Sequence, residues 1–365
     1  MRLSSVRASL EARGLEGLVV FSPANIYYLT GHHSIDSWEF RAAVISHDRP
    51  PEVLLFHFER GRFIASSWLD EARYYGPGDD PIAMLVAMIE EAGLGSARLG
   101  IEVNAATLSA ELKQRVSDCL RSAEFVDVAR LVDELRLCKS TEELATIEQA
   151  AAITELGMLA AVDAAEVDAS DYEVAAAATH AMLMAGSHNL VMMPTIAVGQ
   201  RSGLAHSEHV GRKIQIKDSV FLEMSACWRH YSAPLMKTIF VGQSDRDWDN
   251  MLQIAQDTAD AIVETAKVGV PAREVALAAR SAMSSIEQKV QFHFNFGYSV
   301  GISYPPHWLE ESAFYLTESN SKPLKAGMVF HLPLTFRILG KCASGLSYTI
   351  AITEDGVRIL TGADR

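Results

Sequence analysis

Residues 194–242 contain a glycine-punctuated loop, a basic turn and then two apolar runs, 219–227 and 232–241, that are typical of paired strands. Glu223 lies inside the first run, and the remaining four residues from 220 to 224 are all apolar. Removing an ionised carboxylate from water costs several kcal/mol unless the group is paired, hydrogen-bonded or protonated. We therefore expect Glu223 to have a chemical task.

The first third of the chain alternates short apolar runs with helical patterns. Runs such as 17–21 and 98–103 are separated by stretches with helical periodicity, for example 82–92. Strands that alternate with helices predict an α/β domain. Because 365 residues exceed one ordinary hydrophobic core, we expect two domains, 1–135 and 136–365.

The second domain shows a different pattern. Alanine-rich stretches at 141–165 and 172–185 are strong helix formers, and further runs at 328–334 and 347–353 are typical of strands. Long helices packed behind a mixed, largely antiparallel sheet make an α+β fold. This is the fold class that we predict for the chain.

Charge and cysteine content restrict the partners and the compartment. The formal net charge is −14, which argues against nucleic acid and anionic membranes as partners. No segment approaches the roughly 20 apolar residues that span a bilayer, and the N-terminus lacks the pattern of a signal peptide. The four cysteines show no CxxC spacing, which is typical of reduced thiols. We therefore expect a cytoplasmic protein.

Two side chains are candidates for catalysis. His206 follows a polar loop with glycines at 199 and 203, and imidazole is well matched to proton transfer near neutral pH. The alternative for His206 is an ordinary surface histidine. The alternative for Glu223 is a buried structural ion pair with Lys237 or Arg229.

The stretch 194–242 resembles the creatinase, prolidase and methionine-aminopeptidase superfamily, and the resemblance covers essentially the whole chain. It implies a creatinase-like N-terminal domain and a C-terminal pita-bread domain. Peptidases of this superfamily hold two metal ions with two Asp, one His and two Glu. The segments 297–301 and 327–333 match two further ligand motifs. The residues at the five ligand positions are Glu223, Pro234, Tyr298, Pro333 and Ser347.

Only Glu223 among these five residues is a carboxylate, whereas divalent metals need several convergent oxygen or nitrogen ligands. We therefore expect no metal and no cofactor. Among the metal-free members, the runs 233–238 and 296–301 look more like ectoine hydrolase than creatinase. The resemblance implies a metal-independent hydrolase that opens a non-peptide C–N bond in a small cyclic amidine, converting ectoine to N-acetyl-2,4-diaminobutyrate.

In this interpretation His206 is the acid and base, and Glu223 is either the nucleophile or the anchor that holds the amidinium by two charge-assisted hydrogen bonds. A protonated amidine is already electron-poor, so an acid and a base suffice without a metal. Two alternatives stay open. One is a creatinase-like amidinohydrolase acting on a guanidinium compound, and the other is a non-catalytic pita-bread protein that binds a ligand or partner.

Five further residues are expected to contact the substrate. Tyr298 and His331 belong to the ligand motifs, which should aim them into the pocket, although packing is an equal alternative for Tyr298. The loop 31–41 corresponds to one that closes the partner's active site in creatinase-like dimers. The resemblance therefore implies a homodimer with Trp38, Phe40 and Arg41 as substrate contacts. The alternative is a loop packed on its own domain.

Overall fold

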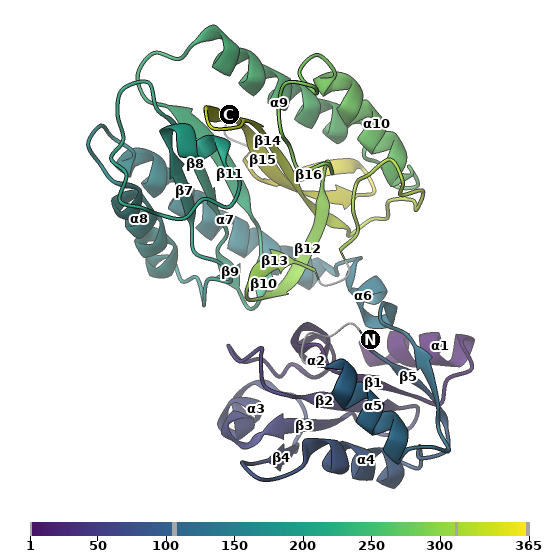
Figure 1. Ribbon diagram of the computed structural model, residues 1–365. Coiled ribbons are helices and arrows are strands. Elements are labelled where there is room, and N and C mark those ends of the chain that lie inside the picture. The colour runs from purple at the N-terminus through teal and green to yellow at the C-terminus, as the bar shows by residue number, and fades with distance from the viewer. Residues whose placement is uncertain (1, 104–107, 311–312, 363–365) are drawn as a thin grey trace. The chain divides into compact units, whose positions relative to one another are not determined.

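The computed structural model describes residues 2–103, 108–310 and 313–362 (Figure 1). Its chain divides into two compact units, Met1–Arg136 and Leu137–Arg365. Separate hydrophobic clusters lie inside each unit, so each has the core that an independent domain requires. No helix in the described ranges is long and apolar enough to cross a membrane.

Unit 1 is the predicted α/β domain. Its sheet has the strand order β4-β3-β2-β1-β5-β6, and β1 pairs in parallel with β5 and antiparallel with β2. The apolar runs form the strands because both faces of this sheet are covered. The strands are β1 (Gly17–Val20), β2 (Ala42–Ser46), β3 (Glu52–Phe56), β4 (Arg73–Tyr75), β5 (Arg98–Ile101) and β6 (Glu124–Asp127). The helices are α1 (Arg2–Ala12), α2 (Pro23–Thr30), η1 (His57–Glu59), α3 (Arg60–Ser66), α4 (Pro81–Glu91), α5 (Ala110–Cys119) and α6 (Leu131–Arg136).

Unit 2 is an α+β domain, as predicted. Its sheet has the strand order β7-β8-β11-β15-β14-β12-β10-β9, with β13 paired to β12 and β16 paired to β15. The strands are β7 (Thr195–Val198), β8 (Ser219–Met224), β9 (Cys227–Trp228), β10 (Tyr231–Ser232), β11 (Leu235–Phe240), β12 (Tyr298–Tyr304), β13 (His307–Leu309), β14 (Val329–Ile338), β15 (Cys342–Thr353) and β16 (Gly356–Thr361). The helices are α7 (Thr141–Ala164), α8 (Asp171–Met184), η2 (Gly199–Gly203), α9 (Arg246–Thr265) and α10 (Ala272–Met283).

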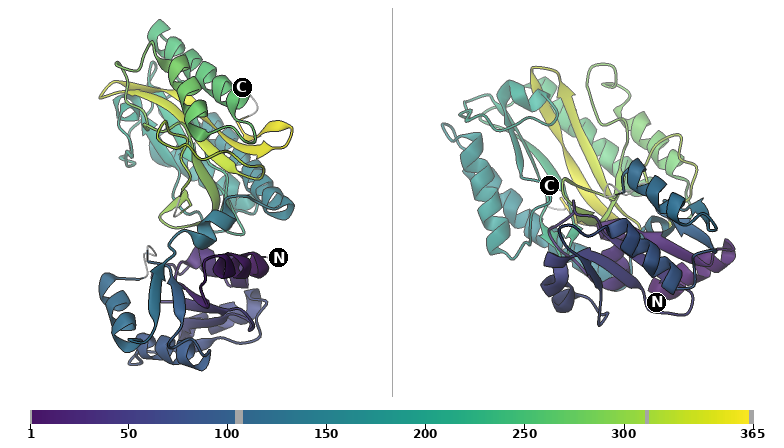
Figure 2. Two further views of the ribbon diagram at one scale, coloured as in Figure 1. Left: turned by 90° about the vertical axis from the view of Figure 1, so that its right-hand side faces the viewer. Right: turned by 60° about the horizontal axis from the view of Figure 1, so that its bottom comes forward.

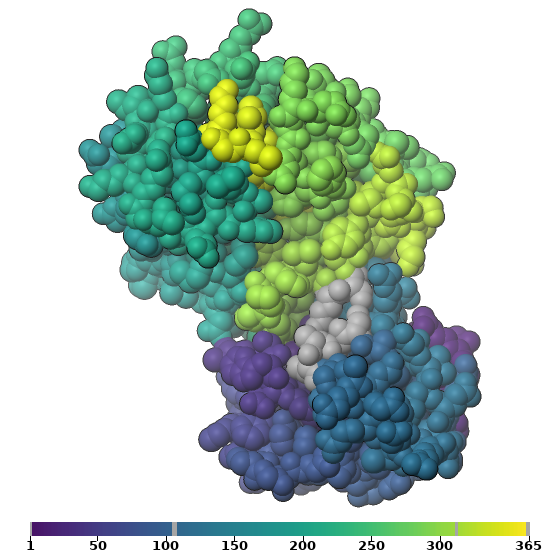
Figure 3. Space-filling view, viewed as in Figure 1, coloured from purple at the N-terminus to yellow at the C-terminus, as the bar shows by residue number. Residues whose placement is uncertain are grey.

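Helices cover one face of the sheet in unit 2. Leu222 and Met224 of β8 belong to one cluster with residues of α7 and α8, whereas the apolar residues of β14 and β15 cluster with α9 and α10. Figures 1 and 2 show α9 and α10 side by side against these two strands. In the space-filling view, the yellow C-terminal end of the chain reaches the surface between the teal and green parts of the unit (Figure 3). Because strand residues alternate between faces, the residues between the packed ones lie on the opposite face.

The two strands predicted at 219–227 and 232–241 are each interrupted in the structure. Pro234 has no N–H to donate to a ladder, and the N–H of Ala233 donates instead to Ser225 Oγ over 3.1 Å. The short strands β9 and β10 form a separate hairpin that turns at Arg229 and His230, both with positive φ. The interruption lets β10 pair with β12 while β11 pairs with β8 and β15.

Candidate functional site

Strand β14 alternates apolar side chains with polar or small ones. Its even-numbered residues from 330 to 336 pack in the cluster with α9 and α10. Its odd-numbered residues therefore lie on the opposite face, and Ser347 and Thr349 of β15 pair with two of them. We call this side of the sheet the polar face. Its members from β14 are His331, Pro333, Thr335 and Arg337.

Glu223 reaches the polar face from β8. It pairs with Met236 of β11, and the Met236 N–H donates to Ser347 Oγ over 2.6 Å. Ser347 in turn pairs with Pro333 of β14. Because cross-strand partners lie on the same face, Glu223, Ser347 and Pro333 form one row across the sheet.

The other two aligned positions lie close to this row. The carbonyl oxygen of Pro234 accepts hydrogen bonds from Thr349 Oγ1 at 2.7 Å and Thr361 Oγ1 at 3.1 Å. Tyr298 pairs with His331, and their ring centroids are 5.4 Å apart. Strands that are distant in sequence thus bring all five positions to one region of unit 2, while the roles of these residues stay predictions.

The environment of Glu223 disfavours its charge. Burial raises the pKa of Glu223 to about 7, and the positive charge of Arg337 opposes that rise. Its side chain still keeps some accessible surface. Lys237 is exposed and pairs with Leu222, which places it on the opposite side of the strand. The alternative of an ion pair with Lys237 is therefore wrong. Because the pKa of Glu223 is about 7, both of its protonation states are populated near neutral pH.

Arg337 is a buried residue of the polar face that sequence reasoning missed. Its side chain is 4% exposed, and its guanidinium carbon lies 4.7 Å from the centroid of the Phe221 ring. Phe221 and Glu223 belong to the same face of β8, because they are two residues apart. The signal that would have found Arg337 is the one that singled out Glu223, a charged residue within an apolar strand.

Tyr298 and His331 are both buried and uncharged. The Tyr298 hydroxyl accepts a hydrogen bond from Trp308 Nε1 at 3.0 Å, and burial together with the charge of Glu223 raises its pKa above the usual value. Burial lowers the pKa of His331 to about 3, with a smaller effect from His293. Tyr298 therefore keeps a proton that it can donate, and His331 is a neutral imidazole.

His206 lies on an exposed turn with a φ of 55°. A left-handed conformation is uncommon for a residue other than glycine. Burial, followed by the charges of Arg337 and His206, lowers the pKa of His293 to about 4. The effect of the His206 charge indicates that His293 lies near His206. Arg337 and His206 thus each act on His293 through their charges. Sequence reasoning did not place His293 in the site.

The loop 31–41 of unit 1 is engaged within its own unit. Arg41 forms an ion pair with Asp36 at 2.9 Å, and its side chain is 3% exposed. Phe40 packs against the core of unit 1, whereas Ile35 and Trp38 are exposed, at 60% and 69%. These contacts match the alternative of a loop packed on its own domain. The substrate contacts of Trp38, Phe40 and Arg41 stay predictions, and so does the homodimer.

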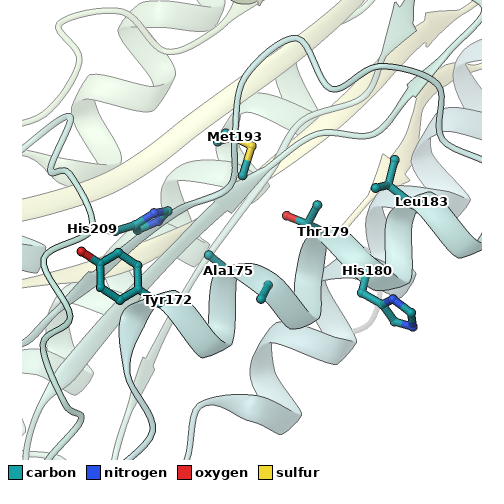
Figure 4. Close-up of a pocket in the computed structure, with 8 residues that line it drawn as sticks. Tyr172, Ala175, Thr179, His180, Leu183, Met193 and His209 are labelled. Carbon is teal, nitrogen blue, oxygen red and sulfur yellow. The ribbon is translucent and has the colours of Figure 1, made fainter.

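A surface cavity of about 440 Å³ lies along α8, and the residues that line it differ from those of the polar face. Tyr172 and His209 face each other at one end of it, and His180 points away (Figure 4). His209 Nε2 accepts a hydrogen bond from the backbone N–H of Ile196 at 3.3 Å, so it has a structural role. Among the described residues that line this cavity there is no carboxylate, lysine or arginine. We therefore place the candidate site on the polar face.

The side chains of the polar face do not fit the two-metal centre of the superfamily's peptidases. Glu223 is the only carboxylate at the five aligned positions, the two prolines offer no side-chain donor, and Arg337 adds a positive charge. Among the described residues, no three His, Cys, Asp or Glu side chains are placed to hold an ion together. The mechanism that we propose therefore includes no metal bound as in those peptidases.

Residues 145–359 match the sequence model of the family described as "Metallopeptidase family M24", which is more than half of the chain. The chain belongs to metallopeptidase family M24. Residues 2–138 match the "Creatinase/Prolidase N-terminal domain". The predicted superfamily and fold class, a creatinase-like domain followed by a pita-bread domain, are thereby confirmed. Membership of M24 also supports hydrolase activity.

Several M24 relatives and structures are similar to this chain. An uncharacterized hydrolase/peptidase of Sinorhizobium fredii is 26% identical and covers 100% of this chain and 95% of its own. The Xaa-Pro dipeptidase of Pyrococcus furiosus is 28% identical over 73% of this chain and 74% of its own. The crystal structure of a prolidase from Thermococcus sibiricus has a TM-score of 0.87 at 22% identity and covers 100% of this chain and 97% of its own. This last similarity shows the fold.

These findings correct the predicted activity. The M24 match and the Xaa-Pro dipeptidases contradict the expectation of a cyclic amidine hydrolase that is similar to ectoine hydrolase. The same relatives count against an amidinohydrolase acting on a guanidinium compound, and they make the non-catalytic alternative less supported. The physical reason is that a lost ligand set indicates which chemistry is unavailable, whereas it does not identify the substrate.

Proposed function

We propose that this M24 protein hydrolyses the peptide C–N bond of a dipeptide-sized substrate on the polar face of unit 2. The observation that carries the proposal is the Glu223 carboxylate, whose pKa of about 7 suits a general base near neutral pH. Membership of the family and the names of the Xaa-Pro dipeptidases support the choice of a peptide bond. The proposed substrate is a small molecule, and the groups that transfer protons and stabilise charge in the reaction are side chains of this chain.

In the first step, Glu223 accepts a proton from a water molecule whose oxygen attacks the amide carbon. The new C–O bond forms as the carbonyl electron pair moves to oxygen. The Tyr298 hydroxyl donates a hydrogen bond to this oxyanion, and the positive charge of Arg337 lowers its energy. Tyr298 is suited to this role because it stays protonated in its buried position.

In the second step, the oxyanion re-forms the carbonyl and the C–N bond breaks. The leaving nitrogen takes a proton from protonated Glu223 or from His206, so the overall reaction is amide plus water to acid plus amine. His206 suits the second route because it lies on an exposed turn and its charge acts on His293. Its role as acid and base therefore stays part of the proposal.

The proposal is tested with Gly-Pro, Ala-Pro and Gly-Ala dipeptides, with the released amino acids measured by mass spectrometry. Protein treated with EDTA is compared with protein supplied with Mn²⁺ or Co²⁺. We expect turnover of at least one dipeptide to survive chelation, because the donor set does not fit a two-metal centre. Failure to cleave all three, or cleavage that appears only with added metal, contradicts the proposal.

The pH dependence of kcat/KM reports the same carboxylate. Because only ionised Glu223 accepts a proton, kcat/KM should rise with pH and level off above an apparent pKa of about 7. Initial rates between pH 5 and 9 at low substrate concentration measure this value. A flat profile across that range, or a limb near the ordinary pKa of a glutamate, argues against Glu223 as the base.

Two expectations about the whole protein also stay proposals. We propose that it is cytoplasmic, because its four cysteines show no pairing motif. We propose a homodimer because the tip of the loop 31–41 presents exposed Trp38 and Ile35.

A further inference from the structure

The cavity along α8 is a second concave surface of unit 2, and its side chains differ from those of the polar face. Its volume is about 440 Å³, and cavities of about 300–1,000 Å³ commonly bind small molecules. On the wall that α8 supplies, Ala175 and Ala176 are too short to fill the space. Met193 and His209, from the segments before β7 and β8, lie across from this wall (Figure 4).

The hydroxyl of Thr179 in the lining differs from those of five other helical threonines. A threonine within a helix commonly donates to the carbonyl four residues earlier. The threonines that do so in this chain are Thr30, Thr146, Thr154, Thr258 and Thr265. Thr179 Oγ1 is buried and has no hydrogen-bond partner among the described residues, and its side chain points to the side of α8 on which Met193 lies (Figure 4). A buried hydroxyl without a partner costs free energy, so a ligand group that bonds to it is favoured.

The lining favours a ligand without charge. No carboxylate, lysine or arginine is found among the described residues of the lining, so an ion would lose water there and gain no partner. His209 Nε2 accepts a hydrogen bond from the Ile196 N–H at 3.3 Å, and an accepting nitrogen carries no proton. His209 is therefore an uncharged imidazole in this arrangement, and His180 points away from the cavity (Figure 4).

The rings and the thioether of the lining favour an aromatic ligand. The rings of Tyr172 and His209 lie 6.2 Å apart at an angle of 74°, an edge arrangement that a further ring can extend. The side chain of Met193 is 59% exposed, and a flexible thioether makes favourable contacts with aromatic rings. Tyr172 and Leu183 lie at opposite ends of the cavity and present apolar surface that a bound ring would cover (Figure 4).

We propose that this cavity binds a small uncharged aromatic molecule that carries one hydroxyl group, with Thr179 as its hydrogen-bond partner. The ligand hydroxyl either donates to Thr179 Oγ1 or accepts from it, since both groups can do either. Its ring contacts Met193 and Tyr172. The proposed hydrolysis uses none of these residues, so binding at this cavity does not depend on turnover at the polar face.

The charge of the ligand is tested with three probes of one shape. Binding of 2-naphthol, 2-naphthoate and 2-naphthylmethylammonium is measured by calorimetry at pH 7. Both ions should bind at least about tenfold more weakly than 2-naphthol, because the lining pairs with neither sign of charge. The cation separates this effect from the general repulsion of anions by a protein of net charge −14. Equal or tighter binding of either ion overturns the assignment to an uncharged ligand.

The hydrogen bond is tested by a double comparison. The affinities for 2-naphthol and for 2-methylnaphthalene, which lacks the hydroxyl, are measured in the wild type and in Thr179→Val. The ratio of the two affinities should be about 3- to 10-fold larger in the wild type, the contribution of one neutral hydrogen bond. The same ratio in both proteins overturns the role of Thr179. If Thr179→Val does not fold, Thr179→Ala removes the same hydroxyl.

The position of the probe is tested separately. In protein labelled at the methionine methyl groups, 2-naphthol should shift the Met193 resonance, assigned from Met193→Leu, more than that of any other of the 13 methionines. Ala176→Phe fills the cavity from an exposed position on α8 and should weaken 2-naphthol binding at least about tenfold. Ala152→Phe, at an exposed position on α7 outside the lining, is the matched control and should bind like the wild type.

Three results would overturn the site itself. One is a largest shift at a methionine other than Met193, and another is an Ala176→Phe variant that binds 2-naphthol like the wild type. The third is cover by a second copy of this chain, in which case the wild type binds no probe and Ala176→Phe lowers the dimer fraction in sedimentation velocity. A protein that binds 2-naphthol at Met193 and cleaves no dipeptide refutes the proposed function and leaves this site standing.

Discussion

Replacing Glu223 with glutamine is expected to lower kcat for dipeptide hydrolysis by about 10²- to 10⁴-fold, the contribution of a well-placed general base. Glutamine keeps the size of the side chain and cannot accept the proton of the attacking water. Because the carboxylate acts on the transition state, KM should change little. Steady-state kinetics with Gly-Pro or another cleaved dipeptide, over pH 6–9, measure both parameters.

The matched control for this change is Glu208→Gln, since Glu208 is an exposed carboxylate near His206 outside the proposed machinery. Its activity should equal that of the wild type. A Glu223→Gln variant with wild-type kcat would show that the base is another group, and the site would have to be placed elsewhere.

The same substitution should change the pH dependence of stability. The folded pKa of Glu223 is about 7 against an ordinary value of 4.5, so the folded state binds more protons between these values. The stability of the wild type therefore falls as pH rises from 4.5 to 7, and the full cost is present above 7. Glu223→Gln should be more stable at pH 8 by an amount on the order of 3 kcal/mol, a difference that disappears below pH 4.5. Denaturant unfolding at both pH values tests this without any substrate.

Replacing Lys139 with methionine is expected to lower the free energy of unfolding of unit 2 by about 3–5 kcal/mol. Lys139 Nζ lies 3.0 Å from Glu310 Oε2, and the two side chains are 1% and 4% exposed. Loss of the lysine leaves the Glu310 carboxylate buried without its cation. The pair is tightly enclosed, because a Cβ on Gly301 would lie 2.6 Å from Glu310 Oε1. Denaturant unfolding at pH 7 measures the change.

An exposed ion pair in the same unit supplies the comparison. Arg358 contacts Glu148 with both side chains about half exposed, so Arg358→Met should cost less than about 1 kcal/mol. The double variant Lys139→Met with Glu310→Leu should recover much of the loss, because it removes both buried charges. A Lys139→Met variant within about 1 kcal/mol of the wild type would mean that Glu310 is protonated or solvated after the change.

Much of the architecture follows from local sequence patterns. Alternating runs and helical stretches predicted the α/β unit, and long helices with extended runs predicted the α+β unit. The interruption at Pro234 was missed, although proline cannot donate to a strand ladder. The break in the strand depends on where Ser225 and Thr349 lie. Ser225 accepts a hydrogen bond from the N–H of Ala233, and Thr349 donates one to the carbonyl oxygen of Pro234.

The candidate site was predicted only in part. Glu223 was identified because a carboxylate among apolar neighbours is costly to bury. Arg337 satisfies the same criterion, but the run predicted at 328–334 ends before it, whereas β14 continues to Ile338. His293 precedes β12 in a segment, 291–296, that alternates polar and aromatic residues, a pattern that favours ordinary strand packing; the backbone bridge between Gln291 and Arg337 brings this segment to β14.

The sequence alone determined the two domain types, the superfamily and the mismatch between its residues and a two-metal ligand set, because these depend on residue identity and spacing along the chain. Tertiary structure decided that Arg337 lies within electrostatic range of both Glu223 and His293, and that Arg41 is occupied by Asp36 within its own unit. The physical reason is that strand alternation assigns each side chain to a face, whereas the pairing of distant strands decides which side chains on that face become neighbours.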